Sequence, residues 1–300
     1  MLQLKSKSKN VLNRPTAFDY FNVVFLGILA VIMVFPLYYT VIVSFATQHA
    51  LITSGLYILP TSFTLDTYRF IFEGGRQILN SFFVSVFVTV VGVSFSMLLS
   101  TIFAYAISKR QVPFTKFVNV FVIITLFFNA GLIPYYLTVQ RVGLVDSIWV
   151  MIIPVAINAF FVILLRNYFQ SLPASLEESA RIDGANDLQI LFRIILPLSK
   201  PILATIALFY AVDRWNEWWH AMLFISNRNI VPLQLVLRQM LINVVSTPGL
   251  GSALRQAHAP IYSRSLQMAV VVVAMVPIMS VYPFAQKYFT KGIMLGAVKG

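Results

Sequence analysis

The sequence predicts an all-α protein that crosses a membrane with six helices. Of its 300 residues, 59% are hydrophobic and only 11% are charged, and the mean hydropathy is +0.82. A water-soluble domain is about half apolar and about one quarter charged, so it could not bury this much apolar surface. In addition, six segments approach the length of about 20 mainly apolar residues that a membrane-spanning helix requires.

The six predicted spans follow one another with polar segments between them. Because a helix satisfies its own backbone hydrogen bonds, it is the element expected in the hydrocarbon core. The predicted spans are Phe21–Phe45, Phe82–Ile107, Val118–Leu137, Ile148–Leu165, Ile202–Phe224 and Leu266–Phe284. They divide the chain into a polar N-terminal segment (1–20), a membrane domain (21–285) and a C-terminal tail (286–300).

The distribution of lysine predicts the orientation of these spans. Every Lys lies on one side, which should therefore be the cytoplasm, namely Lys5, Lys7, Lys9, Lys109, Lys116, Lys200, Lys287, Lys291 and Lys299. Both chain ends are then expected in the cytoplasm. The external side is expected to carry two long segments, 46–80 and 226–265. Within the second, the apolar stretch 231–245 is too short and too polar for a seventh span and predicts an interfacial or re-entrant helix.

Several kinds of chemistry find no support in the sequence. There is no Cys, which excludes disulfides, thiolate metal sites and thiol nucleophiles. The His residues lack metal-binding spacing and no nucleophile elbow is present, so we expect no catalytic or metal-ligating residues. The net charge of +12 comes from residues at span ends and forms no basic face for nucleic acid. No G-x-x-x-x-G-K-[ST] motif occurs, so the chain cannot cradle ATP in the P-loop manner.

The most informative segment is the predicted cytoplasmic loop 172–197, between the fourth and fifth spans. Ser175 and Glu178 have the spacing of a capping box, which predicts the start of a short helix. Gly184 offers the backbone freedom to end that helix. Asp187 is expected to cap a second helix, and Pro197 lies where that helix gives way to the fifth span. The loop is therefore predicted to be a helical hairpin that projects into the cytoplasm.

This loop resembles the EAA loop of ABC importer permeases. The family pattern is E-A-A, three residues, Gly, nine residues and I-x-L-P, and this chain has its counterparts at the same spacing: Glu178, Ser179, Ala180, Gly184, Ile194, Leu196 and Pro197. Ser179 stands where Ala is usual, but a small residue is kept. The resemblance implies the fold of MetI-like ABC permeases, with these residues coupling the permease to an ATPase.

Further segments along nearly the whole chain are similar to carbohydrate-importer permeases. They include Phe63–Tyr68, Asn129–Pro134, Trp215–Glu217 and the tail from Lys287. Within that family the chain resembles the MalG-like half, of the LplC/YtcP type. The resemblance implies a second, MalF-like permease subunit, a dimer of ATPase subunits that binds ATP and Mg, an extracytoplasmic solute-binding protein, and a sugar or oligosaccharide substrate. This chain itself should bind no cofactor.

Polar residues within the spans are candidates for the translocation path, because ionisable and amide groups in a membrane often mark a substrate route. They are Asn80, Asn129, Asn158, Asp213, Trp215, Asn216 and Glu217. A structural interpretation remains open for each of them. The amides can join helices, and Arg214 can pair with Asp213 or Glu217 within an interfacial aromatic belt.

The sequence is also compared with two alternative functions, an ion-coupled secondary transporter and an ABC permease for another solute, because both would be polytopic membrane proteins. An ion-coupled secondary transporter requires acidic or His residues deep in several spans, whereas here only the fifth span carries them. An ABC permease for a solute other than sugar remains compatible with the coupling loop. The external arginines are compatible with acidic polysaccharide fragments but equally with contacts to a binding protein, so they assign no substrate.

Overall fold

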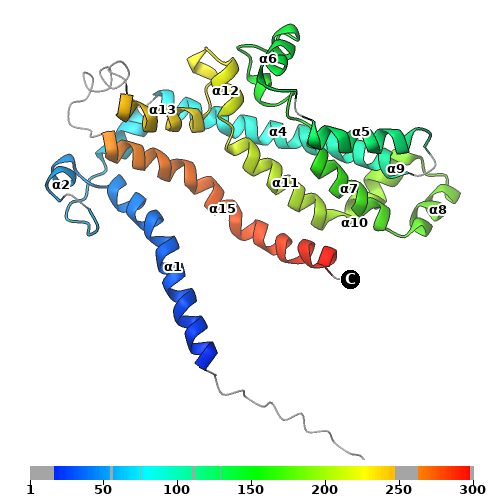
Figure 1. The fold of residues 1–300 in the computed structure, drawn as a ribbon, viewed down its shortest axis with the longest axis horizontal. Helices are drawn as coiled ribbons and strands as arrows, with labels where there is room; N and C mark the ends of the chain where they lie inside the picture. Colours follow the sequence, from blue (N-terminus) through cyan, green and yellow to red (C-terminus); the bar gives the residue numbers. More distant parts are fainter. Residues whose placement is uncertain are drawn as a thin grey trace, which may run out of the picture.

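The computed structural model describes residues 17–54, 57–74, 76–109, 112–128, 130–246 and 263–297, and none of them forms a strand. The longer helices are α1 (Ala17–Ser44), α4 (Arg76–Ser108), α5 (Thr115–Phe127), α6 (Leu132–Arg141), α7 (Ala159–Ser171), α11 (Lys200–Trp215), α13 (Leu233–Ser246) and α15 (Ser263–Ala297) (Figure 1). The short helices are α2 (Gln48–Thr53), α3 (Asp66–Arg69), α8 (Ala174–Ile182), α9 (Asp187–Ile190), α10 (Leu196–Leu198) and α12 (Trp219–Phe224), with the 3₁₀ turns η2 (Ile148–Met151) and η4 (Arg228–Ile230) and the π turns η1 (Phe70–Gly74) and η3 (Leu191–Ile195). The all-α prediction is confirmed.

The predicted spans correspond to a mixture of whole and broken helices. Within the described residues, α1, α4 and residues 264–281 of α15 are each long and apolar enough to cross a membrane. Two bent helix pairs, α5 with α6 and the α9–α10 segment with α11–α12, raise the number of spans to five at most. By length and composition the described structure therefore does not reach the predicted six.

The third predicted span, Val118–Leu137, is divided into two helices. The axes of α5 and α6 differ by 119°, and α6 begins after Gly131, whose φ is +85°. An L-residue with a side chain rarely adopts this conformation, so glycine permits the chain to turn here. The predicted span is therefore two helices with a sharp turn between them, which a hydropathy pattern does not register.

The fourth predicted span, Ile148–Leu165, is helical only in its second half. Residues 148–151 form the 3₁₀ turn η2, residues 152–156 form turns, and α7 begins at Ala159. Pro154 lies in the break, where its missing N–H cannot continue a helical ladder. The Asn158 side chain then accepts hydrogen bonds from the backbone N–H groups of Phe160 and Phe161, at 3.0 and 3.3 Å, and caps α7. The expected continuous helix is therefore a turn segment followed by a shorter helix.

The fifth predicted span, Ile202–Phe224, is also interrupted. Helix α11 ends at Trp215 and α12 begins only at Trp219. The backbone N–H of Asn216 still donates to the Val212 carbonyl at 3.1 Å, and that of Glu217 donates to the Arg214 carbonyl at 3.2 Å. The break thus places the three residues 216–218 between two helices, at the point where polar residues were predicted to gather.

Helices α4, α11 and α15 organise the packing. α4 packs against α7, α11 and α13, while α15 packs against α1, α11 and α13. Figure 1 shows α8 at one extreme of the long axis and α2 and α13 toward the other. The stretch 231–245, predicted to be an interfacial or re-entrant helix, does contain the helix α13, whose Leu233, Leu235 and Leu237 are buried.

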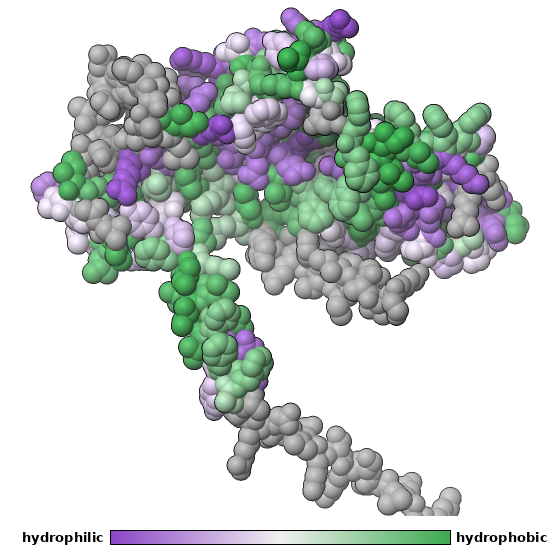
Figure 2. Space-filling view, viewed as in Figure 1, coloured by the Kyte–Doolittle hydropathy of each residue, from purple (hydrophilic) through white to green (hydrophobic). Residues whose placement is uncertain are grey.

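Helix α1 differs from the others in its exposure. Every side chain from Ala17 to Tyr38 is exposed, and α1 forms an arm that Figure 2 shows to be mainly hydrophobic. Only its C-terminal end joins a core, through Val43, Tyr39 and Ile42. An apolar surface of this size in water is unfavourable, so the arm requires lipid or another apolar surface around it.

Candidate functional site

The hairpin formed by α8 and α9 begins differently from the prediction. Helix α8 starts at Ala174, its N-cap is Pro173, and no side chain caps it. The predicted capping box of Ser175 and Glu178 is therefore wrong. Proline fixes φ near the helical value and lacks the N–H that a helix start leaves unpaired, so it can begin the helix two residues earlier than a cap by Ser175 would.

Gly184 ends α8 as predicted. Its φ is +82°, its N–H donates to the Arg181 carbonyl at 3.0 Å, and the next N–H, of Ala185, donates to the Ala180 carbonyl at 2.9 Å. This pair of hydrogen bonds is the Schellman arrangement, in which a left-handed residue after the helix lets its last carbonyls find donors. The turn therefore depends on a glycine at this position.

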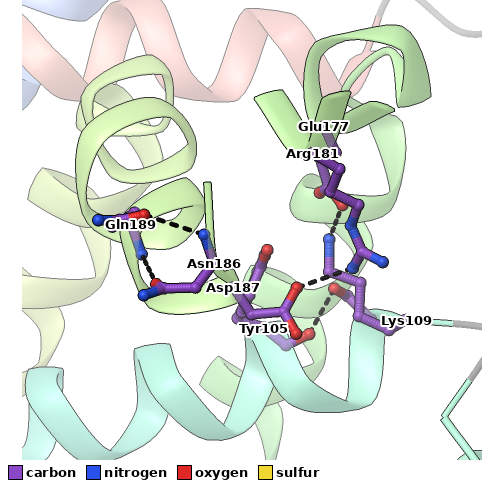
Figure 3. Close-up of polar contacts among 8 residues, drawn as sticks. Tyr105, Lys109, Glu177, Arg181, Asn186, Asp187 and Gln189 are labelled. Carbon is purple, nitrogen blue, oxygen red and sulfur yellow. Dashed lines mark hydrogen bonds and ion pairs between the residues drawn. The ribbon is translucent and has the colours of Figure 1, made fainter. Parts of the chain in front are cut away.

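The second helix is capped one residue earlier than predicted. The Asn186 side chain accepts from the Gln189 N–H at 2.9 Å, and the Gln189 side chain accepts from the Asn186 N–H at 2.9 Å. This capping box replaces the predicted cap by Asp187. Asp187 instead forms an ion pair with Arg181 at 2.7 Å, which joins α9 to α8 across the turn (Figure 3).

Helix α8 is fixed to the C-terminal end of α4. Lys109 forms an ion pair with Glu177, and both side chains are about four-fifths buried, with 17% and 21% exposed. The Lys109 ammonium also lies 4.1 Å from the centre of the Tyr105 ring (Figure 3). Nearby, the Gln170 side chain donates to the Ser108 carbonyl at 3.0 Å. These contacts therefore tie α8 to the C-terminal end of α4.

The predicted coupling residues occupy two different environments. Glu178, Ser179, Gly184 and Pro197 are exposed, Ile194 and Leu196 are partly buried, and Ala180 is 8% exposed within the core that contains Ile190, Leu191 and Ile195. The small Ala180 side chain thus permits α8 to pack on its own chain. The most exposed apolar side chains of the hairpin are instead Ile182, which is 87% exposed, and Leu188, which is 61% exposed. Sequence reasoning missed both, although each is an apolar residue among polar neighbours.

Arg214 of α11 is buried, with 4% of its surface exposed. Its guanidinium donates to the Ser96 hydroxyl at 3.1 Å, to the Met151 carbonyl at 3.5 Å, and to the Val155 carbonyl. Met151 and Val155 belong to the break in the fourth predicted span, whose carbonyls lack a complete helical ladder. The arginine therefore supplies donors that the broken backbone needs.

The predicted pairing of Arg214 with Asp213 or Glu217 is absent from the ion pairs of the described residues. Glu217 instead accepts from the His220 backbone N–H at 2.9 Å, and its second oxygen lies 2.9 Å from His220 Nδ1. Glu217 is buried, and both of its carboxylate oxygens have partners on His220, within the same turn. The side chains of Glu217 and Arg214 thus have different hydrogen-bond partners.

The remaining candidates for the translocation path divide between internal contacts and the surface. Asn80 donates to the Asn229 carbonyl at 2.5 Å, Asn158 caps α7, and the buried Trp215 donates from Nε1 to the Ala274 carbonyl at 3.1 Å. Asp213 and Asn216 are exposed. Asn129 lies outside the described residues. The structure therefore does not gather these candidates into one polar channel.

Comparison with known proteins identifies the family. The model of the family described as "Binding-protein-dependent transport system inner membrane component" matches residues 87–295. The chain belongs to this family. The match includes the hairpin and both broken spans, so the coupling-loop pattern lies in the region that defines the family.

Similar proteins cover nearly the full length of this permease family member. The polygalacturonan/rhamnogalacturonan transport system permease protein YtcP of Bacillus subtilis is 45% identical over 94% of this chain and 98% of the relative. Protein LplC of the same organism is 43% identical over 94% and 95%. A chain in the crystal structure of a bacterial ABC transporter involved in the import of the acidic polysaccharide alginate is 33% identical, with a TM-score of 0.84 over 96% of this chain and 100% of that chain.

Proposed function

We propose that this chain is one of two permease subunits of an ATP-driven importer of oligosaccharides, and that these are acidic fragments rich in uronic acid. The observation that carries the proposal is the braced hairpin. It exposes Ile182 and Leu188 at its surface and ties α8 to α4 through Lys109 and Glu177, in a chain whose sequence has no P-loop. Such an element suits the reception of a mechanical signal from another subunit.

The substrate class is supported by the relatives. YtcP is named for polygalacturonan and rhamnogalacturonan, and the structural neighbour belongs to an importer of alginate. These polymers carry carboxylates on their sugar rings. The basic character of this chain, with a net charge of +12, is compatible with an anionic substrate but does not by itself specify one.

The proposed assembly contains a second, MalF-like permease, two ATPase subunits that bind ATP and Mg, and an extracytoplasmic solute-binding protein. The exposed apolar arm of α1 suits contact with lipid or with the second permease. The lysine distribution supports a multi-pass orientation in the cytoplasmic membrane with both chain ends inside. ATP hydrolysis belongs to the partner subunits, and this chain contributes the path and the coupling contact.

Reconstitution tests this function. The chain is co-expressed with a candidate sister permease and ATPase, and the complex is placed in proteoliposomes containing ATP and Mg. With the binding protein outside, we expect accumulation of trigalacturonate and faster ATP hydrolysis. Vesicles without the ATPase are the control and should accumulate none. Uptake that persists without the ATPase, driven by an ion gradient, would contradict the proposal and support a secondary transporter.

A further inference from the structure

A groove of about 570 Å³ opens beside the break between α11 and α12. One wall contains polar side chains, namely Asn216, Trp218, Gln234 and Arg238, and the other is the apolar face of α15 from residue 271 to residue 278. Its volume falls within the range of about 300–1,000 Å³ that is usual for small-molecule sites. A sugar ring has the matching character, with polar edges and an apolar face.

Arg238 supplies the only charge among the lining side chains. Its guanidinium carbon lies 3.7 Å from the centre of the Trp218 ring. Within the described residues, no carboxylate or other hydrogen-bond acceptor pairs with Arg238. In a stacked pair the flat face of the guanidinium lies on the ring. Its N–H groups point outward in the guanidinium plane and remain available for hydrogen bonds. The arginine is thus held against Trp218, and no acceptor among the described residues uses its donors.

Gln234 adds a second polar group on the same side of the groove. It precedes Arg238 by four residues on α13, so the two side chains lie on one face of that helix. The Asn216 amide nitrogen donates to the Val212 carbonyl at 2.9 Å, which fixes the orientation of the amide and leaves its oxygen as an acceptor. Donors and acceptors therefore converge on the groove from two different elements.

The walls of the groove are held by hydrogen bonds outside it. Trp215 Nε1 donates to the Ala274 carbonyl and fixes the end of α11 against α15. Gln267 Nε2 donates to the Met240 carbonyl at 2.9 Å and fixes α13 against α15. A site whose walls are already in place loses less free energy to ordering when a ligand binds.

The geometry points to a subsite for one uronic acid ring of the transported oligosaccharide. The sugar carboxylate would be bound by Arg238, whose planar fork matches a carboxylate in two hydrogen bonds. Ring hydroxyls would bind Gln234 and Asn216, and the apolar face of the ring would lie on α15. This inference rests on the proposed function and adds a place in this chain where the acidic substrate is recognised.

The absence of cysteine permits a direct test by thiol labelling. Ile278 lines the groove and is 38% exposed, whereas its neighbour Met279 is 58% exposed and does not line it. Ile278→Cys and Met279→Cys are each introduced into the complete importer, prepared with cysteine-free partners, and labelled with a maleimide. Trigalacturonate at about ten times its dissociation constant should slow labelling at position 278 about tenfold, as mass action requires. It should leave position 279 unchanged.

The contribution of the carboxylate is tested with a neutral sugar and with Arg238→Gln. Maltotriose should give no protection at position 278. Arg238→Gln should raise the concentration of trigalacturonate that half-protects position 278 by about tenfold or more, the effect of losing a charged hydrogen bond. Gln234→Leu is a second variant that keeps the stacked arginine and should also weaken protection, by less.

The results separate this inference from the proposed function. If the complex imports trigalacturonate but the sugar does not protect position 278, the groove is not the subsite although the importer function stands. Three further results would each overturn the inference as well. The thiol at position 278 could fail to react without sugar, maltotriose could protect it equally, or trigalacturonate could protect it fully in Arg238→Gln. If the complex imports no oligosaccharide, the proposed function itself fails.

Discussion

Arg214 of α11 lies across Gly92 of α4, so that a Cβ atom added to the glycine would stand 3.1 Å from the Arg214 Cδ. The guanidinium continues past this point to Ser96, one helical turn further along α4. The side chain thus passes between two helices and reaches the broken segment beyond them. Residues 92 and 96 therefore determine whether the arginine can occupy this position.

Replacement of Gly92 should disturb this crossing. Gly92→Val places a branched side chain where the Arg214 stem lies, and overpacking of this kind typically costs about 1–3 kcal/mol. We expect a lower melting temperature of the purified complex and less protein in the membrane. Gly27→Val is the matched control, because nothing lies within 4 Å of a Cβ added there. Equal behaviour of the two variants would contradict the close approach.

Removal of the Arg214 guanidinium should destabilise the broken fourth span. Arg214→Met keeps an unbranched stem but leaves the Met151 and Val155 carbonyls without this donor. Each buried group that loses its partner costs about 1–3 kcal/mol. Arg228→Met, at an exposed arginine of η4, should change stability by less than about 0.5 kcal/mol. Thermal unfolding followed by size-exclusion fluorescence compares the two, and a stable Arg214→Met complex would disprove the donor role.

The Lys109–Glu177 ion pair should have a measurable interaction energy. A double-mutant cycle of Lys109→Met and Glu177→Gln is expected to give about 0.5–3 kcal/mol in an unfolding titration, because both side chains are largely buried. The comparison pair is Arg69 and Glu73, separated by 4.0 Å and 70% and 73% exposed. Its cycle should give about 0–1 kcal/mol. If the two cycles give the same value, the brace between α4 and α8 is no stronger than a surface pair.

The orientation can be tested at two positions of similar exposure. Phe114 is 80% exposed and lies between α4 and α5, while Leu59 is 71% exposed and lies in the predicted external segment. With a membrane-impermeant maleimide, Leu59→Cys should react in intact cells whose outer barrier is open. Phe114→Cys should react only after the cytoplasmic membrane is permeabilised. Ser199, on the same predicted side as Phe114, is fully buried and is therefore unsuitable for labelling. Reaction of Phe114→Cys in intact cells would reverse the orientation.

Hydropathy predicted the positions of the spans better than their continuity. α1, α4 and α15 cover the first, second and sixth predicted spans, because an apolar stretch without a strong break has only a helix available to it in a membrane. The breaks after α5 and before α7 depend on Gly131 and Pro154. The sequence shows that these two residues can interrupt a helix. Whether each one kinks the helix or ends it depends on which groups satisfy the freed backbone N–H and C=O groups.

The sequence predicted only part of the candidate site, again because some of its contacts depend on backbone groups. The turn at Gly184 follows from local chemistry, and the sequence is sufficient to find it. The role of Arg214 could not be predicted in this way, because its main acceptors are the backbone carbonyls of Met151 and Val155. Every residue has a backbone carbonyl, so a pattern of side chains does not identify which carbonyls accept from Arg214. A signal was nonetheless present, since Gly92 and Ser96 belong to a row of small residues along the buried face of α4.

Gly184 provides the sharpest test of the coupling hypothesis. A Cβ added to it meets nothing within 4 Å, so there is open space in the described chain for the first atom of a Gly184→Val side chain. Its cost within the permease is the left-handed backbone, about 1–2 kcal/mol. If an ATPase surface lies against the hairpin, the same side chain should also obstruct docking. We therefore expect a folded complex of both permeases that loses the ATPase or its stimulation by the loaded binding protein.

The control for this variant is Gly143, which has a φ of +75° and equally open space around its Cβ position. Gly143→Val imposes the same backbone strain in the loop after α6, far along the chain from the hairpin. The two variants should thus lose similar stability, and only Gly184→Val should lose ATPase occupancy in co-purification or stimulated ATP hydrolysis. If both retain the ATPase and its stimulation, then Gly184 is only a helix terminator and the hairpin does not dock at its turn. If both lose them equally, backbone strain is the cause and contact with the ATPase is not.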